Sequence, residues 1–155
     1  MNLLENLARA SLLFSLWLLV LTADLGAAER GQTGVQLKID TILASNQNDD
    51  FDPRLSGMKN QLAELKYRSY RLLKEETQKV PWQANATFDI PRGRVLGVVP
   101  QEYRNDRVSL KVRLLEGDKP LLDTTLTIRN RRNFLLAGPA HEGGVLILSI
   151  SVTTQ

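Results

Sequence analysis

The chain has 155 residues, of which 43% are hydrophobic and 24% charged, and its formal net charge is +3. These values fit one globular domain. The sequence contains no cysteine, which excludes disulfide bonds, zinc–thiolate sites, iron–sulfur clusters, cysteine nucleophiles and a lipidated N-terminal cysteine.

The first 28 residues have the pattern of a secretory signal peptide. Arg9 precedes an apolar run at residues 10–21, and small residues follow up to Ala28. As a helix this run would span ~18 Å at ~1.5 Å per residue, less than a ~30 Å hydrocarbon core. We therefore expect cleavage after Ala28 and a periplasmic or secreted mature protein of residues 29–155 with net charge +4. An uncleaved N-terminal anchor is the alternative.

The mature chain begins with a strand and a helix. Residues 35–44 alternate between apolar and other side chains, which predicts a strand with one apolar face. After a polar loop, Asp52 and Pro53 form a helix start, with Asp52 as the cap and Pro53 at the first position. Four apolar residues at helical spacing then predict one buried stripe on a helix of residues 52–66. They are Leu55, Met58, Leu62 and Leu65.

The rest of the chain is rich in predicted strands. Residues 67–79 fit a helix or a strand, and two tyrosines with the following Pro81 favour the strand. Further strands are predicted at residues 84–90, 96–100, 108–114, 122–128, 134–137 and 145–152. Pro100 indicates an edge or a strand end. The last strand is apolar on both faces, which predicts a central position.

This pattern predicts one α+β domain, with a mostly antiparallel sheet of six to eight strands and the helix packed on one face. A β-sandwich is the alternative, because strands recur about every ten residues.

Few residues carry recognisable chemistry. His141 is the only histidine, and its glycine-rich surroundings predict an exposed turn residue. The acidic loop at residues 46–52 lacks the spacing of a calcium-binding EF-hand. No nucleophile elbow, phosphate loop or dinucleotide fingerprint occurs. We therefore expect no catalytic residues, no metal, no cofactor and no enzymatic activity. Nucleic acid is not expected as a partner, because the chain is exported and lacks aromatic stacking residues.

The arginines are the most informative charged residues. If the strands after residue 84 form an up-and-down meander, successive turns fall at alternate ends of the sheet. Turns two and four then place five arginines at one end, diluted only by Glu102 and Asp106. These are Arg104, Arg107, Arg129, Arg131 and Arg132, called here the basic end. Such an end attracts an anionic lipid surface or an acidic envelope protein, and the alternative is a set of solvated turn residues without a partner.

Six short motifs are spread over nearly the whole mature chain. They are Ile39-x-x-Ile42-x-Ala44-Ser45-Asn46, Asp52-Pro53-x-Leu55, Tyr67-x-Ser69-Tyr70-Arg71-Leu72-Leu73, Pro91-x-Gly93-Arg94, Ala137-Gly138-Pro139 and Gly143-Gly144-Val145-Leu146-Ile147-Leu148. Together they resemble a family of small exported bacterial proteins of unknown function, which implies location and no particular activity. Residues 126–150 are also similar to the glycine-bearing hairpin near the end of outer-membrane secretins, with Arg131 and Arg132 where a polar-glycine turn is usual.

The sequence therefore predicts a non-enzymatic periplasmic binding or assembly module of the bacterial envelope. Two alternatives stand beside it. One is a structural component of a secretion or surface apparatus, which the hairpin similarity favours. The other is an enzyme that uses exposed carboxylates, although no paired carboxylates fall on predicted strand ends. The oligomeric state is not predicted.

Overall fold

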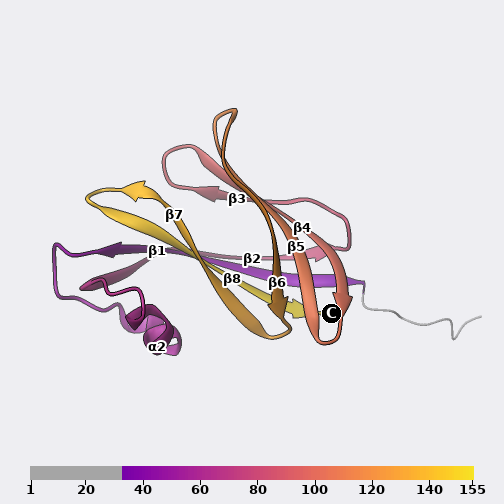
Figure 1. Ribbon diagram of the computed structural model, residues 1–155, viewed down its shortest axis with the longest axis horizontal. Helices are drawn as coiled ribbons and strands as arrows, with labels where there is room; N and C mark the ends of the chain where they lie inside the picture. Colours follow the sequence, from indigo (N-terminus) through magenta and orange to yellow (C-terminus); the bar gives the residue numbers. More distant parts are fainter. Residues whose placement is uncertain (1–32) are drawn as a thin grey trace, which may run out of the picture. The chain divides into compact units, whose positions relative to one another are not determined.

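A computed structural model describes residues 33–155, so the predicted signal peptide lies outside the described residues. Eight strands form two four-stranded antiparallel sheets (Figure 1). Sheet A has the order β2-β1-β8-β7 and sheet B the order β3-β4-β5-β6. The strands are β1 (Gly34–Ser45), β2 (Ser69–Pro81), β3 (Ala86–Ile90), β4 (Arg94–Arg104), β5 (Arg107–Glu116), β6 (Lys119–Arg129), β7 (Arg132–His141) and β8 (Gly144–Thr154).

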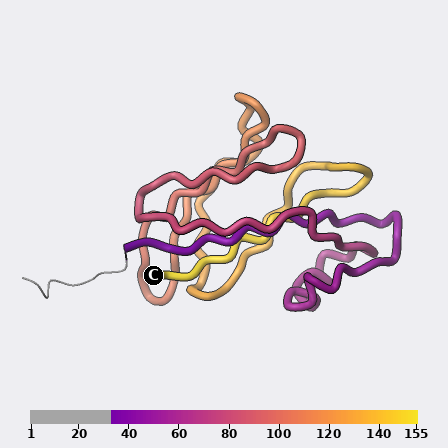
Figure 2. Tube along the Cα trace, turned by 180° about the vertical axis from the view of Figure 1, so that it is seen from behind, coloured from indigo at the N-terminus to yellow at the C-terminus, as the bar shows by residue number. Residues whose placement is uncertain are grey.

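The C-terminal strand β8 lies inside sheet A, between β1 and β7, as its two apolar faces predict. It pairs with β1 along almost its full length, from Val35 opposite Thr154 to Ala44 opposite Val145. Figure 2 shows these two strands running side by side, although they are the first and last strands of the described residues. Residues 146–150 are all buried, so β8 is covered on both of its faces.

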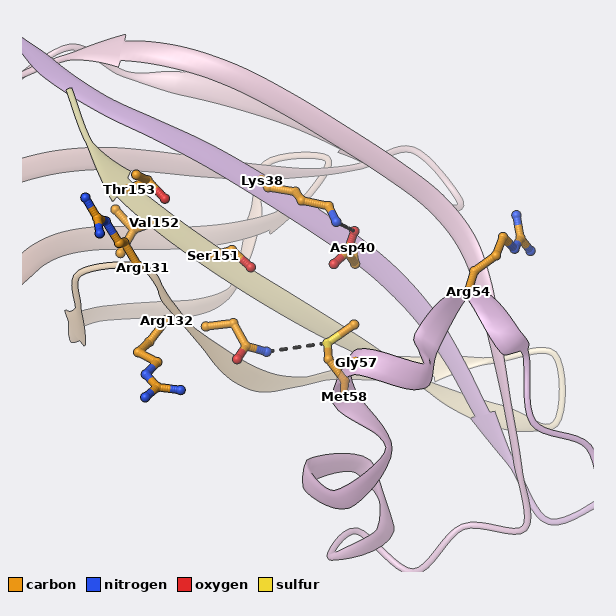
Figure 3. Close-up of a pocket in the computed structure, with 11 residues that line it drawn as sticks. Lys38, Asp40, Arg54, Gly57, Met58, Arg131, Arg132, Ser151, Val152 and Thr153 are labelled. Atoms are coloured by element: carbon orange, nitrogen blue, oxygen red, sulfur yellow. Dashed lines mark hydrogen bonds and ion pairs between the residues drawn. The ribbon is translucent and has the colours of Figure 1, made fainter.

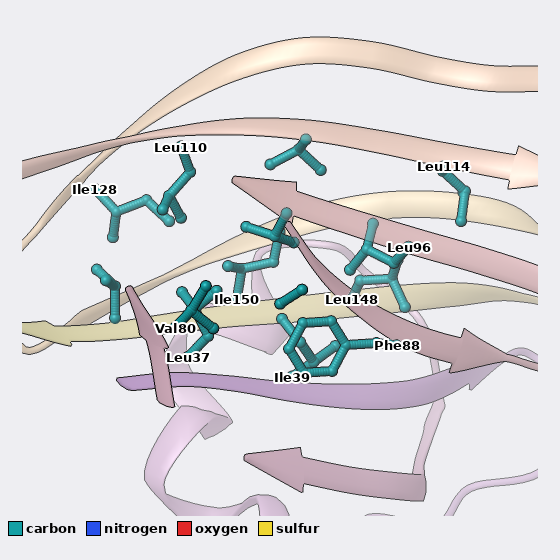
Figure 4. Packing of buried hydrophobic residues seen from close by; sticks show 14 of the residues in the cluster. Leu37, Ile39, Val80, Phe88, Leu96, Leu110, Leu114, Ile128, Leu148 and Ile150 are labelled. Carbon is teal, nitrogen blue, oxygen red and sulfur yellow. The ribbon is translucent and has the colours of Figure 1, made fainter. Parts of the chain in front are cut away.

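The main core lies between the two sheets (Figure 4). Leu37 and Leu148 from sheet A pack in one cluster with Phe88, Leu96 and Leu110 from sheet B. Burying one such side chain stabilises the fold by roughly 1.5–3 kcal/mol relative to leaving it exposed. Backbone ladders hold each sheet together internally, so these apolar contacts are the principal interaction that joins the layers.

A short helical segment covers the other face of sheet A. It consists of the 3₁₀-helix η1 (Pro53–Met58) and one turn of α-helix, α2 (Lys59–Ala63). Leu55 and Leu62 are buried in a second cluster that includes Ile42 and Ile147 of sheet A. The hydroxyl of Tyr70 donates a hydrogen bond to the Leu62 carbonyl at 2.6 Å, which fixes the end of the helix to β2.

The helix is shorter than the sequence pattern predicts. It begins at Pro53, but it ends at Ala63, and Lys66 has a positive φ of 62°. Its first six residues form a 3₁₀-helix, which has about three residues per turn. The predicted apolar stripe assumed α-helical spacing throughout, so it does not extend to Leu65, its fourth member. Leu65 is consequently 38% exposed, and its predicted burial was wrong.

The start of the helix follows the prediction closely. The Asp52 side chain accepts a hydrogen bond from the Arg54 backbone N–H at 3.0 Å, which is the expected capping contact. The same carboxylate accepts two bonds from the Arg54 guanidinium, at 3.0 and 2.6 Å. It also accepts one from the Leu72 N–H at 3.1 Å, so Asp52 joins the helix to β2.

The strand predictions are largely confirmed. The ambiguous residues 67–79 fall mainly in strand β2, and the predicted six to eight antiparallel strands are present as eight. They divide into two sheets, however, and the helix is small, so the fold fits either predicted class. Pro100 is neither on an edge strand nor at a strand end. It lies in β4 beside an irregularity in the pairing with β5, beyond the last residue that pairs with β3.

We expect Leu62→Ala to lower the free energy of unfolding by roughly 2–5 kcal/mol, the usual range for truncating a buried leucine. Leu65→Ala is the matched control, because the same side chain is exposed three residues later. It should cost much less, about 0.5 kcal/mol. Urea titrations of both variants measure the difference, and equal losses would show that the helix is not docked through Leu62.

A second prediction concerns Asp52. The hydrogen bonds from Arg54 hold its pKa below the ordinary value of 3.8. A carboxyl group with a lowered folded pKa stabilises the protein above its unfolded pKa, and this stabilisation declines as the pH falls further. Asp52→Asn should therefore be less stable than the parent protein at pH 7, and the gap should narrow below about pH 4. Denaturant midpoints between pH 7 and pH 2.5 test this, and a gap that does not depend on pH contradicts it.

Candidate functional site

Three arginines of the basic end stand side by side on neighbouring strands of sheet B. Arg104 of β4 is directly opposite Arg107 of β5, which in turn is directly opposite Arg129 of β6. Opposite residues of antiparallel strands point to the same face of the sheet. In β5 the next residue, Val108, is buried in the core, so this arginine row lies on the outer face of sheet B.

A tight turn produces this alignment. Asn105 and Asp106 alone connect β4 to β5, and both have a positive φ, of 51° and 61°. Two consecutive positive values are typical of the type I′ turn, and asparagine and aspartate tolerate that conformation well. The turn therefore forces Arg104 and Arg107 into direct register.

The other two arginines follow on the connection to sheet A. Asn130 and Arg131 link β6 to β7, and Arg132 is the first residue of β7. The Asn130 N–H donates to the Asp106 carbonyl at 2.8 Å, so the second and fourth turns after residue 84 meet as predicted. The predicted single meander is wrong, however, because β7 pairs with β8 in sheet A and not with β6.

One carboxylate partly compensates the charge of the basic end. Arg129 Nε lies 3.0 Å from Asp106 Oδ2, and this hydrogen bond is the main reason that the pKa of Asp106 is lowered. The nearby charge of Arg131 acts in the same direction. Both partners are exposed, so the pair is screened by solvent and contributes little to stability. Glu102 is the other acidic residue near these turns, and it lines a hollow together with Arg104 and Arg107.

The structure distributes the five arginines over separate hollows. Arg104 and Arg107 line a hollow of about 260 Å³ on the outer face of sheet B. Arg129, Arg131 and Arg132 line an open hollow of about 750 Å³, together with Asp106. Arg131 and Arg132 also reach a third one, of about 390 Å³, on the outer face of sheet A (Figure 3).

This third hollow, called here the Asp40 pocket, contains residues that the sequence did not single out. It extends from the helical segment at Gly57 and Met58 to the start of β7. Lys38 and Asp40 of β1 contribute their side chains, as Figure 3 shows. Its remaining lining residues are Arg54, Arg131, Arg132, Asn133, Ser151, Val152 and Thr153.

Asp40 is the unusual member of this pocket, since it is only 3% exposed. Lys38 Nζ lies 3.6 Å from Asp40 Oδ1, an ion pair that is too long for a hydrogen bond. Among residues 33–155, no hydrogen-bond partner of Oδ1 is present. Burial raises the pKa of Asp40, and Lys38 opposes this shift. In the sequence Asp40 looks like an exposed residue on the polar face of a strand, so no signal could have identified it.

One further sequence prediction needs correction. His141 is not an exposed turn residue, because it ends β7 and is only 7% exposed. The exposed turn of that hairpin is formed by Glu142 and Gly143, which both have a positive φ. Arg94 at the opposite end of sheet B is buried, and its Nε lies 3.5 Å from Glu116 Oε2.

Within the described part of the chain, no group of three or more histidine, cysteine or acidic side chains is placed to hold a metal ion. In the same residues no helix is long and apolar enough to cross a membrane. The chain has no significant match among protein-family models, among curated proteins or among solved structures. The family resemblance and the secretin similarity therefore stay predictions.

The arginine row leads to a test of stability. Like charges directly opposite each other on neighbouring strands destabilise a sheet, by up to about 1 kcal/mol per pair. Arg107 is the middle member, so Arg107→Thr should raise the free energy of unfolding, by a few tenths to about 1 kcal/mol. The gain should shrink in high salt, which screens exposed charges.

Arg71→Thr is the matched control, because Arg71 is an exposed strand arginine opposite Leu43 and not opposite another cation. Denaturant unfolding of both variants at low and high salt measures the effect. A loss of stability for Arg107→Thr equal to that of the control would show that the row carries no repulsion.

Proposed function

We propose that this protein is a non-enzymatic binding module of the bacterial envelope that attaches to an anionic surface through its basic end. The observation that carries the proposal is the direct register of Arg104, Arg107 and Arg129. Aligned like charges cost free energy in the isolated protein, and a bound anionic surface would remove that cost. An arrangement of this kind favours a partner that supplies negative charge.

The start and the end of the described chain lie at the basic end. The Gln155 N–H donates to the Gly34 carbonyl at 3.0 Å, and Thr154 exchanges two hydrogen bonds with Asn130, each at 3.0 Å. The described chain therefore starts beside the turn that carries Arg131. Residues 1–28 are predicted to direct export, so the chain that follows them enters the domain at the basic end. In an uncleaved protein this connection would hold the basic end next to the membrane, whereas after cleavage at Ala28 attachment depends on the arginines alone.

Electrostatic attraction at this site should be short-ranged. Exposed charges are screened over about 8 Å at physiological ionic strength. Each basic residue close to an anionic membrane contributes about 1 kcal/mol of attraction. Five arginines can therefore give measurable association in low salt that weakens strongly when salt is added.

The test is co-sedimentation of the mature protein with vesicles that contain anionic lipid. We expect the triple variant Arg107→Gln, Arg131→Gln, Arg132→Gln to lose at least tenfold in apparent affinity. The control is Arg71→Gln, Arg92→Gln, Lys119→Gln, which removes the same charge from the opposite end. Arg94, which also lies near that end, is left unchanged because it is buried. Equal losses of affinity in the two variants would show that binding depends only on net charge. Absence of binding by the parent protein would refute the proposal.

A second candidate is a structural component of a secretion or surface apparatus. Strand β7 is an edge of sheet A, residues 133–140 carry no charge, and Phe134 on this edge is 40% exposed. An uncharged edge strand offers unpaired backbone groups to another strand. This candidate uses a different surface, so the arginine variants would leave such an assembly intact.

A further inference from the structure

Strand β7 is the least protected of the four edge strands in the two sheets. The other edge strands are β2, β3 and β6. Strand β2 carries five charged residues, β6 carries three, and β3 is only five residues long. Charged side chains and short length are common means of keeping an edge strand from pairing with another chain. In β7 residues 133–140 contain no charged side chain, so neither protection applies there.

The side of the sandwich at which β7 lies is also incompletely closed. Phe134 is opposite Ile150, and opposite residues of paired strands point to the same face. Ile150 is fully buried in the main core, so Phe134 points towards the same interior, yet it is 40% exposed. Leu136, which is opposite the buried Leu148, is also only partly buried. The inner face of β7 therefore leaves apolar surface that a further strand would cover.

The other side of the sandwich, where β2 and β3 lie, is closed by side chains. Gln78 Nε2 donates to the Thr87 carbonyl at 2.9 Å, and Lys74 Nζ donates to the Asp89 carbonyl at 3.4 Å. Phe88 of β3, the aromatic residue on the inner face at this side, is 1% exposed. The exposure of Phe134 is thus a property of the β7 side and not of the sandwich as a whole.

The part of β7 that can accept another strand is short. Strand β7 pairs regularly with β8 from Arg132 to Ala137, and the pairing is irregular from there to Ala140. Pro139 lies in the irregular part and has no N–H group to donate. Residues 132–137, called here the β7 edge, are therefore the part that can pair.

The charges at the two ends of β7 determine which strand fits. Arg131 and Arg132 lie at its start, and Glu142, whose side chain is 58% exposed, follows its end. A second copy of β7 in antiparallel orientation brings the arginines of each copy towards Glu142 of the other. Parallel orientation would place the two pairs of arginines together, and like charges repel each other. The strand is thus complementary to itself when a two-fold axis relates the two copies.

We propose that two copies of this protein associate through the β7 edge, in antiparallel orientation about a two-fold axis at Leu135. Leu135 is the middle of the regular and uncharged residues 133–137. This register places Phe134 of each copy opposite Leu136 of the other on the inner face, so both apolar side chains gain cover. Sheet A then continues from one copy into the other. The proposal goes beyond attachment through the basic end, because the β7 edge is a different surface.

The first experiment locates the axis with introduced cysteines, which is direct because the chain contains none of its own. Leu135→Cys should form a disulfide-linked dimer on mild oxidation, since directly opposite Cβ atoms lie about 4.5–5.5 Å apart. Ala137→Cys is the matched control, because in this register its two copies lie ~13 Å apart, too far for a disulfide bond. A mixture of the Ala137→Cys and Asn133→Cys proteins should be cross-linked again. Cross-linking of Ala137→Cys with itself, or failure of both Leu135→Cys and the mixture, would overturn the proposal.

The second experiment measures association of the mature protein without any cross-link. The interface is short, so analytical ultracentrifugation over a range of concentrations should show a weak, reversible monomer–dimer equilibrium. Ala137→Lys places a charge on the β7 edge and should weaken association at least about tenfold. Thr87→Lys is the control, because Thr87 is also exposed on an edge strand, and it should leave association unchanged.

A protein that stays monomeric at every concentration would overturn the proposal, even if an unrelated apolar peptide bound to the β7 edge. Equal losses in the two lysine variants would overturn it as well, because added charge alone would then explain them. Arg107→Gln separates this proposal from attachment through the basic end, because Arg107 lies in sheet B. It should weaken vesicle association and leave the dimer unchanged.

Discussion

The need to cover β8 on both of its faces determines how this domain is built. Residues 146–150 are buried throughout, and they alternate between the two faces of sheet A. Sheet B covers the inner face through the main core, and the helical segment covers part of the outer face through Leu55 and Leu62. At an edge, β8 would leave apolar surface exposed, and the first and last described strands accordingly lie together in the middle of sheet A.

The helical segment covers only part of the outer face of sheet A, and the Asp40 pocket begins beside this segment. Beyond Met58 the outer face of sheet A changes from apolar to polar side chains. There Asn133 donates to Ser149 at 2.9 Å and to Gln61 at 3.0 Å, so these buried polar groups are satisfied within the protein. Asp40 Oδ1 is the exception on this face among the described residues, and the Lys38 ammonium, 3.6 Å away, is the charge that compensates it.

The basic end is positioned by turns more than by packing. The positive φ values of Asn105, Asp106 and Arg131 hold the arginines at one end, where they flank exposed turns. Their mutual repulsion is a small cost that the apolar core can offset. The first described strand begins at the same end, since Gln155 is hydrogen-bonded to Gly34 and Thr154 to Asn130 of the turn. The charge of the arginines and the start of the described chain thus lie at one end of the domain, which is why we propose surface binding as its function.

The sequence by itself determined the period-two strands, the start of the helix at Asp52 and Pro53, and the central place of β8. These features depend on local geometry and on the burial of each face, which alternation reveals directly. Only the tertiary structure decided that the strands divide into two sheets, that the helix stops at Ala63 and that Asp40 is buried. These outcomes depend on which distant segment covers a given face, and a strand position that faces solvent reads the same in the sequence as one that lies beneath a helix.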